Sequence, residues 1–445
     1  MNKKVLIITY YWPPAGGPGV QRVLKFAKYL PEFGWDPIIL TVANGEYPAI
    51  DESLAKDIPE GCKVFKTKTL EPSTFYRKFT GMKQDEKIPV ANLAQKNISW
   101  KKKLSNWVRL NLFIPDAKIG WIPYAVAQGK KIINEEKPDI IFSSSPPPTV
   151  HLIAKKLAKW SGLKWVADFR DPWTDIYHYD GVKRSAYALN KDLRLEKSVI
   201  AKATKTVVVS KHIGTYLLKD NFPNKSVEII TNGFDETDFK QAVQPEPNDS
   251  FTIAYAGKIN NQQNPENFWK AISELKNENQ DFSLNLKILL MGNITDDVFN
   301  SIKSNNLDEN LVDLGYVSHP EMIENISKSQ VLLLLIPNTK KNLSIVPGKI
   351  FEYLATKKYI IGIGPRKGDS AEILADAQAG EMFEFSDYES LKLRILEHYK
   401  NWEKNIQPTI NEKALNNFSR LHLTKKLITV FENIFGSLNS DEYSI

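Results

Sequence analysis

"SIVPGKIFEYLATKKYIIGIG", residues 344–364, combines the two elements that decide the fold: a helical pattern after a Pro-Gly-Lys turn, and then a short apolar run. The run is continuous rather than alternating, which is typical of a parallel strand covered on both faces. Comparable runs recur between amphipathic stretches: KVLIIT, PIILTV, PDIIFSSS, KWVADF, TVVVS, VEIIT, FTIAYAG, LKILLMG and VLLLLIP. The sequence therefore predicts an α/β fold with doubly wound, parallel sheets.

A polar, proline-bearing linker divides these runs into two sets. It reads QAVQPEPNDS, residues 241–250, and the strand pattern restarts directly after it. A chain of 445 residues also exceeds the size of one ordinary hydrophobic core. We therefore expect two Rossmann-like domains, at 1–245 and 246–427, followed by a C-terminal helix end and tail at 428–445.

Composition narrows the class of protein. Hydrophobic residues make up 42% of the chain and charged residues 25%, as in soluble globular proteins. The net charge of +7 suits phosphate-bearing substrates, anionic lipid or nucleic acid, but no recognised nucleic-acid module is present. Cys62 is the single cysteine, so an intramolecular disulfide and a cysteine-based zinc site are excluded, and a cytoplasmic location is expected. No apolar stretch approaches the ~20 residues of a membrane-spanning helix.

Residues 97–121, NISWKKKLSNWVRLNLFIPDAKIGW, form an unusual insertion in the first half. Trp100, Leu104 and Trp107 fall on one helical face, and Lys101, Lys102, Lys103 and Arg109 add positive charge. A basic amphipathic helix with tryptophans is typical of a segment that lies in a membrane interface. The alternative is an insertion that packs on its own domain with solvated lysines.

Glycines follow three of the apolar runs, where ligands bind in parallel α/β sheets. Gly16 and Gly17 follow the first run, Gly257 precedes Lys258, and Gly292 ends LKILLMG. Glycines at such turns let the backbone approach an anion at a helix N-terminus, although a tight turn without a ligand explains them too. The spacing is not G-x-G-x-x-G, so a phosphate-bearing ligand fits better than a nicotinamide dinucleotide.

The opening stretch contains a second candidate for anion binding. Pro347 suits a first helical position, and Gly348 leads into Lys349 and Glu352, which then share the first turn. Lys349 and the helix N-terminus can hold a diphosphate, and Glu352 can accept hydrogen bonds from ribose hydroxyls. The alternative is an acid that complements the helix dipole beside a surface lysine.

Several ordered motifs together resemble the GT-B nucleotide-sugar glycosyltransferases of retaining family four. They are PPAGGPGVQR, TNGFD, YAGK and VPGKIFEYLA, and the resemblance extends from Lys3 to Leu427. DFRDPW and IPDAKIGW further resemble a bacterial branch that builds surface polysaccharides. The resemblance implies two Rossmann-like domains that face each other across a cleft, with the acceptor on the first and a nucleoside-diphosphate sugar on the second.

The same resemblance assigns roles in the donor site. It implies that Glu352 binds the nucleotide ribose and that Lys258 is one of two basic residues on the diphosphate. The second basic position has no lysine here, and Lys349 is the candidate to replace it. Ser344 stands where the family has an acid that contacts the donor sugar, which leaves the sugar contact undefined.

Two further loops resemble donor-binding segments. LGYVSHPEM resembles the segment whose backbone receives the base, around Tyr316 and Val317, and MGNITD resembles the glycine turn at Gly292. Ordinary strand-to-helix loops remain the alternative for both.

The first domain contains the acceptor-side candidates. Family members often have a histidine after the fifth strand, where this chain has Asp168, Arg170, Asp171 and then Trp173. Asp168 could orient or deprotonate an acceptor hydroxyl and Arg170 could pair with a phosphate, or the three charges form a structural ion network. His151 is a weaker acceptor-side candidate.

The resemblance implies a retaining glycosyltransferase of the hexosyltransferase type, which uses a nucleoside-diphosphate sugar and a carbohydrate or lipid-linked acceptor. The six histidines lack paired ligand spacing, so we expect neither a metal nor another cofactor. Front-face attack, in which the leaving phosphate takes the acceptor proton, is the expected mechanism. The alternatives are a GT-B sugar-nucleotide epimerase and a non-catalytic nucleotide-binding member. The location expected is cytoplasmic, with peripheral contact at the anionic inner face of the membrane.

Overall fold

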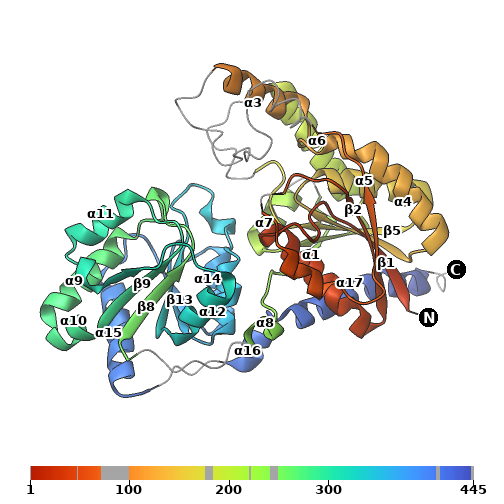
Figure 1. The fold of residues 1–445 in the computed structure, drawn as a ribbon. Coiled ribbons are helices and arrows are strands. Elements are labelled where there is room, and N and C mark those ends of the chain that lie inside the picture. Colours follow the sequence, from red (N-terminus) through yellow and green to blue (C-terminus); the bar gives the residue numbers. More distant parts are fainter. Residues whose placement is uncertain are drawn as a thin grey trace. The chain divides into compact units, whose positions relative to one another are not determined.

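The computed structural model describes residues 2–47, 49–71, 100–175, 184–219, 222–240, 249–406 and 411–441 (Figure 1). The chain forms two compact units, which consist of residues 1–231 with 423–445 and of residues 232–422. Each unit is built on one parallel sheet with helices on both faces, so the α/β prediction is confirmed. Among the described residues, no helix is long and apolar enough to cross a membrane.

Unit 1 has a seven-stranded sheet in the order β3-β2-β1-β4-β5-β6-β7. Its strands are β1 (Lys3–Ile8), β2 (Trp35–Val42), β3 (Lys63–Thr67), β4 (Ile140–Ser145), β5 (Lys164–Phe169), β6 (Lys205–Val208) and β7 (Val227–Ile229). All neighbouring pairs are parallel, and the strand order reverses between β1 and β4. The apolar runs that form β1, β2, β4, β5 and β6 are largely buried on both faces, as their lack of alternation predicts, whereas the edge strand β7 exposes Ile229.

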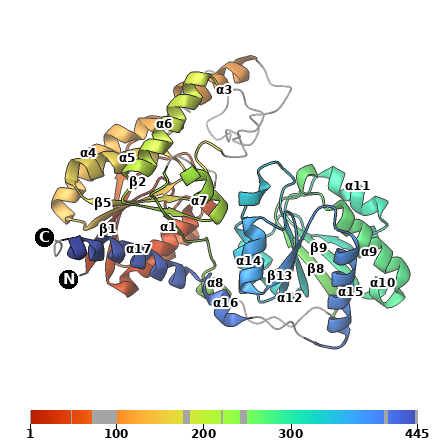
Figure 2. The same ribbon diagram turned by 180° about the vertical axis from the view of Figure 1, so that it is seen from behind.

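The helices of unit 1 are α1 (Pro18–Tyr29), α3 (Trp100–Leu112), α4 (Ile122–Glu136), α5 (Thr149–Ser161), α6 (Ala186–Lys202), α7 (Lys211–Leu218) and most of α17 (Arg420–Asp441). They cover both faces of this sheet, except α3, which packs against α6 away from the strands (Figure 2). Short 3₁₀ turns occur at η1 (Leu30–Phe33), η2 (Glu52–Asp57) and η3 (Ile119–Trp121). The helix expected in the 97–121 insertion is therefore present as α3, whereas residues 97–99 lie outside the described ranges.

Unit 2 has a six-stranded parallel sheet in the order β10-β9-β8-β11-β12-β13. Its strands are β8 (Phe251–Ala256), β9 (Leu286–Met291), β10 (Leu311–Asp313), β11 (Val331–Leu335), β12 (Tyr359–Ile363) and β13 (Gly380–Phe383). Its helices and 3₁₀ turns are α8 (Glu236–Lys240), η6 (Asn261–Gln263), α9 (Glu266–Glu278), α10 (Gln280–Asn285), α11 (Asp296–Ser304), η7 (Asp308–Asn310), α12 (His319–Lys328), η8 (Asn342–Ser344), α13 (Lys349–Ala355), α14 (Asp369–Ala377), α15 (Glu389–Glu403) and α16 (Glu412–Asn416).

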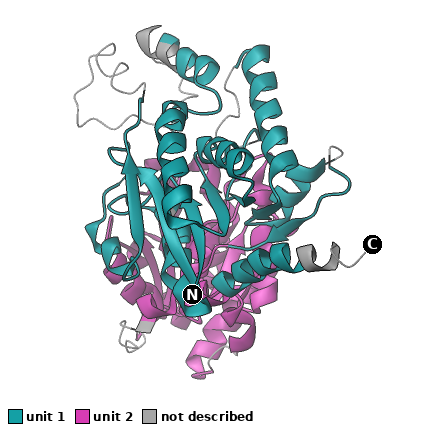
Figure 3. Cartoon of the chain, turned by 90° about the vertical axis from the view of Figure 1, so that its right-hand side faces the viewer, with its two compact units in different colours: residues 1–231, 423–445 teal, residues 232–422 magenta. Residues whose placement is uncertain are grey.

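The boundaries of the units differ from the expected 1–245 and 246–427, and Figure 3 shows the observed division at 231/232 and 422/423. At the first boundary, Phe234 forms a β-bridge with Ser419, which ties residues 232–240 to unit 2 before the linker begins. At the second, α17 returns to unit 1. The Phe431 ring lies 5.2 Å from that of Trp35, so the part of the expected helix end and tail around Ile428, Phe431 and Ile434 contributes to the core of unit 1.

The opening stretch forms a helix and a strand, α13 and β12, as predicted. The expectation that Pro347 takes the first helical position is wrong, because α13 begins at Lys349. The chain enters the helix through a 3₁₀-type turn, in which the amide of Ile350 donates to the carbonyl of Pro347 at 3.1 Å. Lys349 and Glu352 nevertheless share the first helical turn.

Candidate functional site

Three glycines with left-handed backbone angles follow the strands at one edge of the unit 2 sheet. They are Gly257 after β8, Gly292 after β9 and Gly315 after β10, with φ angles of +133°, +130° and +60°. The amide of Gly292 donates to the carbonyl of Gly315 at 2.6 Å, and a Cβ on Gly292 would lie 2.2 Å from the carbonyl oxygen of Gly257. A side chain at Gly292 would therefore clash with the turn at Gly257, whereas Gly315 has open space beside it and is favoured only by its backbone angle.

Lys349 extends from the first turn of α13 to the end of β8. Its Nζ donates to the hydroxyl of Tyr255 at 2.7 Å and lies 4.0 Å from the centroid of that ring. A Cβ on Gly257 would lie 2.3 Å from the same nitrogen, so the amine occupies the space that a side chain would fill. Among the described residues, no carboxylate lies within ion-pair distance of Lys349.

Burial changes the ionisation of this amine. It lowers the pKa of Lys349 to about 7, and the negative charge of Glu352 partly opposes the change. A half-buried amine without a carboxylate partner gains most from an anion that binds beside it, because the charged form is then stabilised. The arrangement is therefore suited to an anionic ligand.

Two tyrosines connect α13 with the end of β8. The hydroxyl of Tyr255 donates to the carbonyl of Lys258 at 2.8 Å, and the amide of Ala256 donates to the hydroxyl of Tyr353 at 2.8 Å. Both tyrosine side chains are fully buried, whereas Lys258 is exposed. The position of Lys349 relative to the glycine turns is thus determined by buried contacts.

Glu352 faces the start of α12. Its Oε1 lies 3.1 Å from Nε2 of His319, and the two side chains are 34% and 55% exposed. Tyr316 and Val317 precede α12, with Tyr316 almost fully exposed and Val317 half-buried. Sequence reasoning did not place His319 in the site, although Ser318 before His319 and Pro320 is a typical helix start.

The remaining donor-site candidates lie before α13. Ser344 ends η8 and is half-buried, Pro347 is half-buried, and Gly348 is exposed with open space where a Cβ would lie. The structure thus brings Gly292 and Lys349 next to Gly257, and Glu352 shares the first turn of α13 with Lys349. Their role in donor binding stays a prediction.

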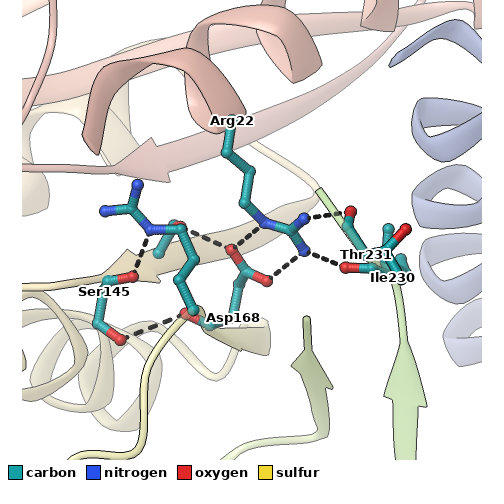
Figure 4. A network of polar contacts seen from close by, with 7 residues as sticks. Arg22, Ser145, Asp168, Ile230 and Thr231 are labelled. Atoms are coloured by element: carbon teal, nitrogen blue, oxygen red, sulfur yellow. Dashed lines mark hydrogen bonds and ion pairs between the residues drawn. The ribbon is translucent and has the colours of Figure 1, made fainter. Parts of the chain in front are cut away.

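In unit 1, Asp168 belongs to a closed polar network at the end of β5 (Figure 4). Its carboxylate accepts from Arg22 Nε at 2.9 Å, from Arg22 Nη2 at 2.7 Å and from Ser144 Oγ at 2.6 Å. Arg22 also donates to the carbonyls of Ile230 and Thr231. Asp168 is fully buried and its contacts are those of a structural ion network, which leave it no access to an acceptor hydroxyl.

Arg170 is buried and bound to carbonyls rather than exposed toward a phosphate. Its guanidinium donates to Ser145 and Gly19 at 2.6 Å each, and to Pro146 at 3.2 Å. Burial lowers the pKa of Arg170, while Asp171 and Asp168 raise it. Asp171 is the exposed member of the three charged candidates.

The glycines before α1 take part in a turn that is bound to a neighbouring segment. The amide of Gly16 donates to the carbonyl of Ala49 at 2.8 Å, and Ala15 forms a bridge with Ile50. Gly17 is exposed at the start of α1 with φ +87°. These contacts fit the turn interpretation of the pair.

His151 and Trp173 lie in the core of unit 1. His151 is fully buried, with Nδ1 2.8 Å from Ser143 Oγ and its ring 4.5 Å from that of Phe169. Burial lowers the pKa of His151 to about 3, so the ring is neutral near pH 7. The indole of Trp173 donates to Asp192 at 2.7 Å. Neither side chain is placed to contact an acceptor directly.

Within the ranges that the structure describes, no three His, Cys, Asp or Glu side chains gather in a way that could hold a metal ion.

The sequence matches two family models, Glycosyltransferase Family 4 over residues 95–238 and Glycosyl transferases group 1 over residues 236–414. No curated protein sequence matches the chain. A glycosyltransferase from Rickettsia africae has a similar structure, at 19% identity, with 98% of this chain and 99% of that chain covered and a TM-score of 0.60.

Two further solved structures share the fold. Sucrose-phosphate synthase from Thermosynechococcus elongatus is 14% identical, with 98% and 100% of the chains covered and a TM-score of 0.58. HepE of Anabaena in complex with UDP is 12% identical, with 97% and 100% covered and a TM-score of 0.57. Both family models that match are models of glycosyltransferases, and the architecture of the chain is the GT-B fold that these solved structures share.

Proposed function

We propose that the chain transfers a sugar from a nucleoside diphosphate to a hydroxyl of a carbohydrate or lipid-linked acceptor, with retention, in the synthesis of a cell-surface polysaccharide or glycolipid. The observation that carries the donor assignment is the amine of Lys349, which lies against Gly257 and has no carboxylate partner in the part of the chain that the structure describes. The complex of Anabaena HepE with UDP supports the same class of donor.

The donor would contact four parts of unit 2. Lys349 Nζ and the exposed Lys258 would hold the diphosphate, and the glycine turns would let the phosphates approach the backbone. Glu352 would accept hydrogen bonds from the ribose, in exchange for its contact with His319. The backbone around Tyr316 and Val317 would receive the base. Ser344 leaves the donor-sugar contact without the acid that is usual in the resembling family.

Transfer would break the bond between the anomeric carbon and the diphosphate oxygen and form a bond from that carbon to the acceptor oxygen on the same face. The acceptor proton would pass to the departing phosphate, so no protein nucleophile is needed. Two lysines beside the leaving group would stabilise the charge that develops on it, and we expect no metal requirement. A product of inverted configuration, seen by nuclear magnetic resonance, would refute this mechanism.

In unit 1, the buried candidates would help acceptor binding by positioning the backbone rather than by touching the acceptor. Arg170 and Asp168 would act as positioning residues, because their contacts hold the loop after β4 and the start of α1. Asp171, as the exposed acid, is the member of this group that could contact an acceptor.

A thermal-shift panel of nucleoside diphosphates and their sugar conjugates tests the donor assignment. Nucleoside diphosphates with one particular base should raise the melting temperature of the wild-type chain. Glu352→Ala should bind the same compounds roughly tenfold more weakly, because the hydrogen bonds from the ribose to the carboxylate are lost. Glu321→Ala, in the first turn of α12, is the matched control and should respond as wild type. An unchanged response of Glu352→Ala would refute the ribose assignment, and no response of the wild type to any compound would refute the donor class.

Activity measurements separate the alternatives. Sugar-nucleotide isomerisation without an acceptor would establish an epimerase, and binding without turnover across a donor and acceptor panel would establish a non-catalytic member. Ser344 is the residue that keeps the second alternative open.

We also propose peripheral contact of α3 with an anionic membrane at its cytoplasmic face. The sequence of α3 has four basic residues and no acid, and Leu104, Trp107 and Leu112 are exposed. The neighbouring α6 exposes Tyr187, while its acids Asp192 and Glu196 are buried.

Sedimentation with anionic liposomes tests this proposal. Trp107→Ser should reduce binding several-fold, because the interfacial contact of the indole is lost. Trp160→Ser removes a similarly exposed tryptophan from α5 and is the control. Equal binding of both variants and wild type would contradict the role of α3.

A further inference from the structure

Tyr255 lies at the end of β8, directly beneath the two lysines of the donor site. Its hydroxyl accepts a hydrogen bond from Lys349 Nζ at 2.7 Å and donates one to the carbonyl of Lys258 at 2.8 Å. Its ring also faces the amine of Lys349, 4.0 Å from the centroid. One buried side chain therefore contacts both residues that the proposed function assigns to the diphosphate.

The direction of these bonds follows from the chemistry of a phenol. A phenol has one hydrogen to donate and lone pairs to accept with, and a lysine ammonium can only donate. The hydrogen of Tyr255 must then go to the carbonyl of Lys258, and the ammonium of Lys349 is held by the lone pairs and the ring face. Burial raises the pKa of Tyr255, so the phenol keeps its hydrogen near pH 7.

We infer that Tyr255 is a positioning residue for the donor: it holds the Lys349 ammonium and the turn at Lys258 where both meet the diphosphate. The inference rests on the proposed function and adds a residue that does not itself touch the ligand. Gly257 lies between the two lysines and leaves the space that the amine needs.

A purely structural role would have a different signature. Tyr255 belongs to the apolar core of unit 2, so any substitution could lower stability. Phenylalanine keeps the ring and removes only the hydroxyl that accepts from Lys349. The charged form of Lys349 would lose that acceptor, which lowers its pKa further below the ordinary value, so the binding defect should grow as pH rises.

The charged and titratable groups around Lys349 come from three elements. Glu352 and Tyr353 lie on its own helix, Tyr255 and Lys258 lie at the end of β8, and His319 lies beyond Glu352 on α12. A comparison of variant and wild type at the same pH cancels the titration of the other groups and of the ligand phosphate.

The experiment measures the affinity of Tyr255→Phe for UDP and for inorganic pyrophosphate by calorimetry at two pH values. Relative to wild type, we expect binding about tenfold weaker near pH 8 and less than about threefold weaker near pH 6. Tyr399→Phe removes another buried phenol from the same core and should match wild type at both pH values. Lys349→Arg stays charged, so its affinity relative to that of wild type should rise from pH 6 to pH 8, as Lys349 of the wild type loses its proton.

The outcomes separate this inference from the proposed function. If wild type binds neither probe, or if Lys349→Met binds both as tightly as wild type, the diphosphate assignment fails, and the inference fails with it. If Lys349→Met is weakened but Tyr255→Phe matches wild type at both pH values, only the role of Tyr255 is overturned. An equal loss at both pH values, together with a lower melting temperature, would make Tyr255 a structural residue and also overturn the inference.

Discussion

Each sheet has a polar cluster at the carboxyl ends of its strands, and the two clusters differ in charge balance. The closed cluster of unit 1 is formed by Asp168 and Arg22, and the open cluster of unit 2 is formed by Lys349, Tyr255 and Gly257. In unit 1, Asp168 and Arg22 are buried as a pair, and their remaining hydrogen-bonding groups contact Ser144 and backbone carbonyls. In unit 2, Lys349 is bound to a phenol and has no carboxylate within ion-pair distance among the described residues. A saturated network holds a fold together, whereas a cation without a counter-ion can gain from binding an anion. Whether a buried charge has a counter-ion therefore distinguishes a structural cluster from a ligand-binding one better than the types of residue present do.

The strongest test of this contrast removes one partner of the closed cluster. Asp168→Ala leaves the buried guanidinium of Arg22 without its carboxylate, so the free energy of unfolding should fall by about 3–5 kcal/mol. Urea denaturation measures the change. Asp171→Ala, three residues away and exposed, should cost less than about 0.5 kcal/mol.

A double variant sharpens the same test. Replacing Arg22 by Met together with Asp168→Ala removes the orphaned charge, so part of the lost stability should return. If the single variant is as stable as wild type, the network is not structural, and Asp168 would again be a candidate for acceptor chemistry.

Acid should destabilise unit 1 through the buried His151. Its pKa is about 3 in the folded chain and near 6.5 when unfolded, so the unfolded state takes up a proton first as pH falls. Stability should therefore decline from about pH 6.5 downward, by up to about 1.4 kcal/mol per pH unit, until about pH 3.

His151→Phe is the variant that isolates this effect. It should be less stable than wild type near pH 7.5, because the contact with Ser143 is lost, but should lose less stability between pH 6.5 and pH 5.5. Urea midpoints at the three pH values give the comparison. Equal pH slopes for the two proteins would show that another group is responsible.

In the open cluster, Gly257→Ala should separate ligand binding from folding. The added methyl would lie 2.3 Å from Lys349 Nζ, so the amine must move, and affinity for UDP should fall roughly thirtyfold, which is about 2 kcal/mol. Gly61→Ala also places an alanine at a positive φ angle, +75°, but with open space around it, and should leave UDP binding unchanged. Equal affinities of the two variants would remove Lys349 from the site.

Sequence reasoning succeeded where the information is local. The parallel sheets followed from continuous apolar runs, and the shared turn of Lys349 and Glu352 followed from helical spacing. The resemblance to a family correctly indicated the GT-B fold, which composition alone could not have distinguished from other α/β folds.

Contacts between residues far apart in the sequence could not be predicted from local patterns. Arg22 and Asp168 are separated by 146 positions, and Tyr255 and Lys349 by 94, so nothing in either local pattern links them. The boundary at 231/232 depends on the bridge between Phe234 and Ser419, which brings distant segments together in the same way. For that reason the polar linker was a poor guide to where unit 1 ends.

The smallest expected effect concerns the exposed pair of His319 and Glu352. Exposed pairs contribute about 0.2–1 kcal/mol, so His319→Ala should leave stability nearly unchanged and alter UDP affinity by less than about threefold. UDP should bind more tightly to this variant, because the contact between Glu352 and His319 no longer has to be broken before Glu352 accepts hydrogen bonds from the ribose. His319→Gln retains a donor and should lie between the alanine variant and wild type in calorimetry. A loss of tenfold or more would instead mean that His319 contacts the nucleotide itself, and the open cluster would then extend from Lys349 to the start of α12.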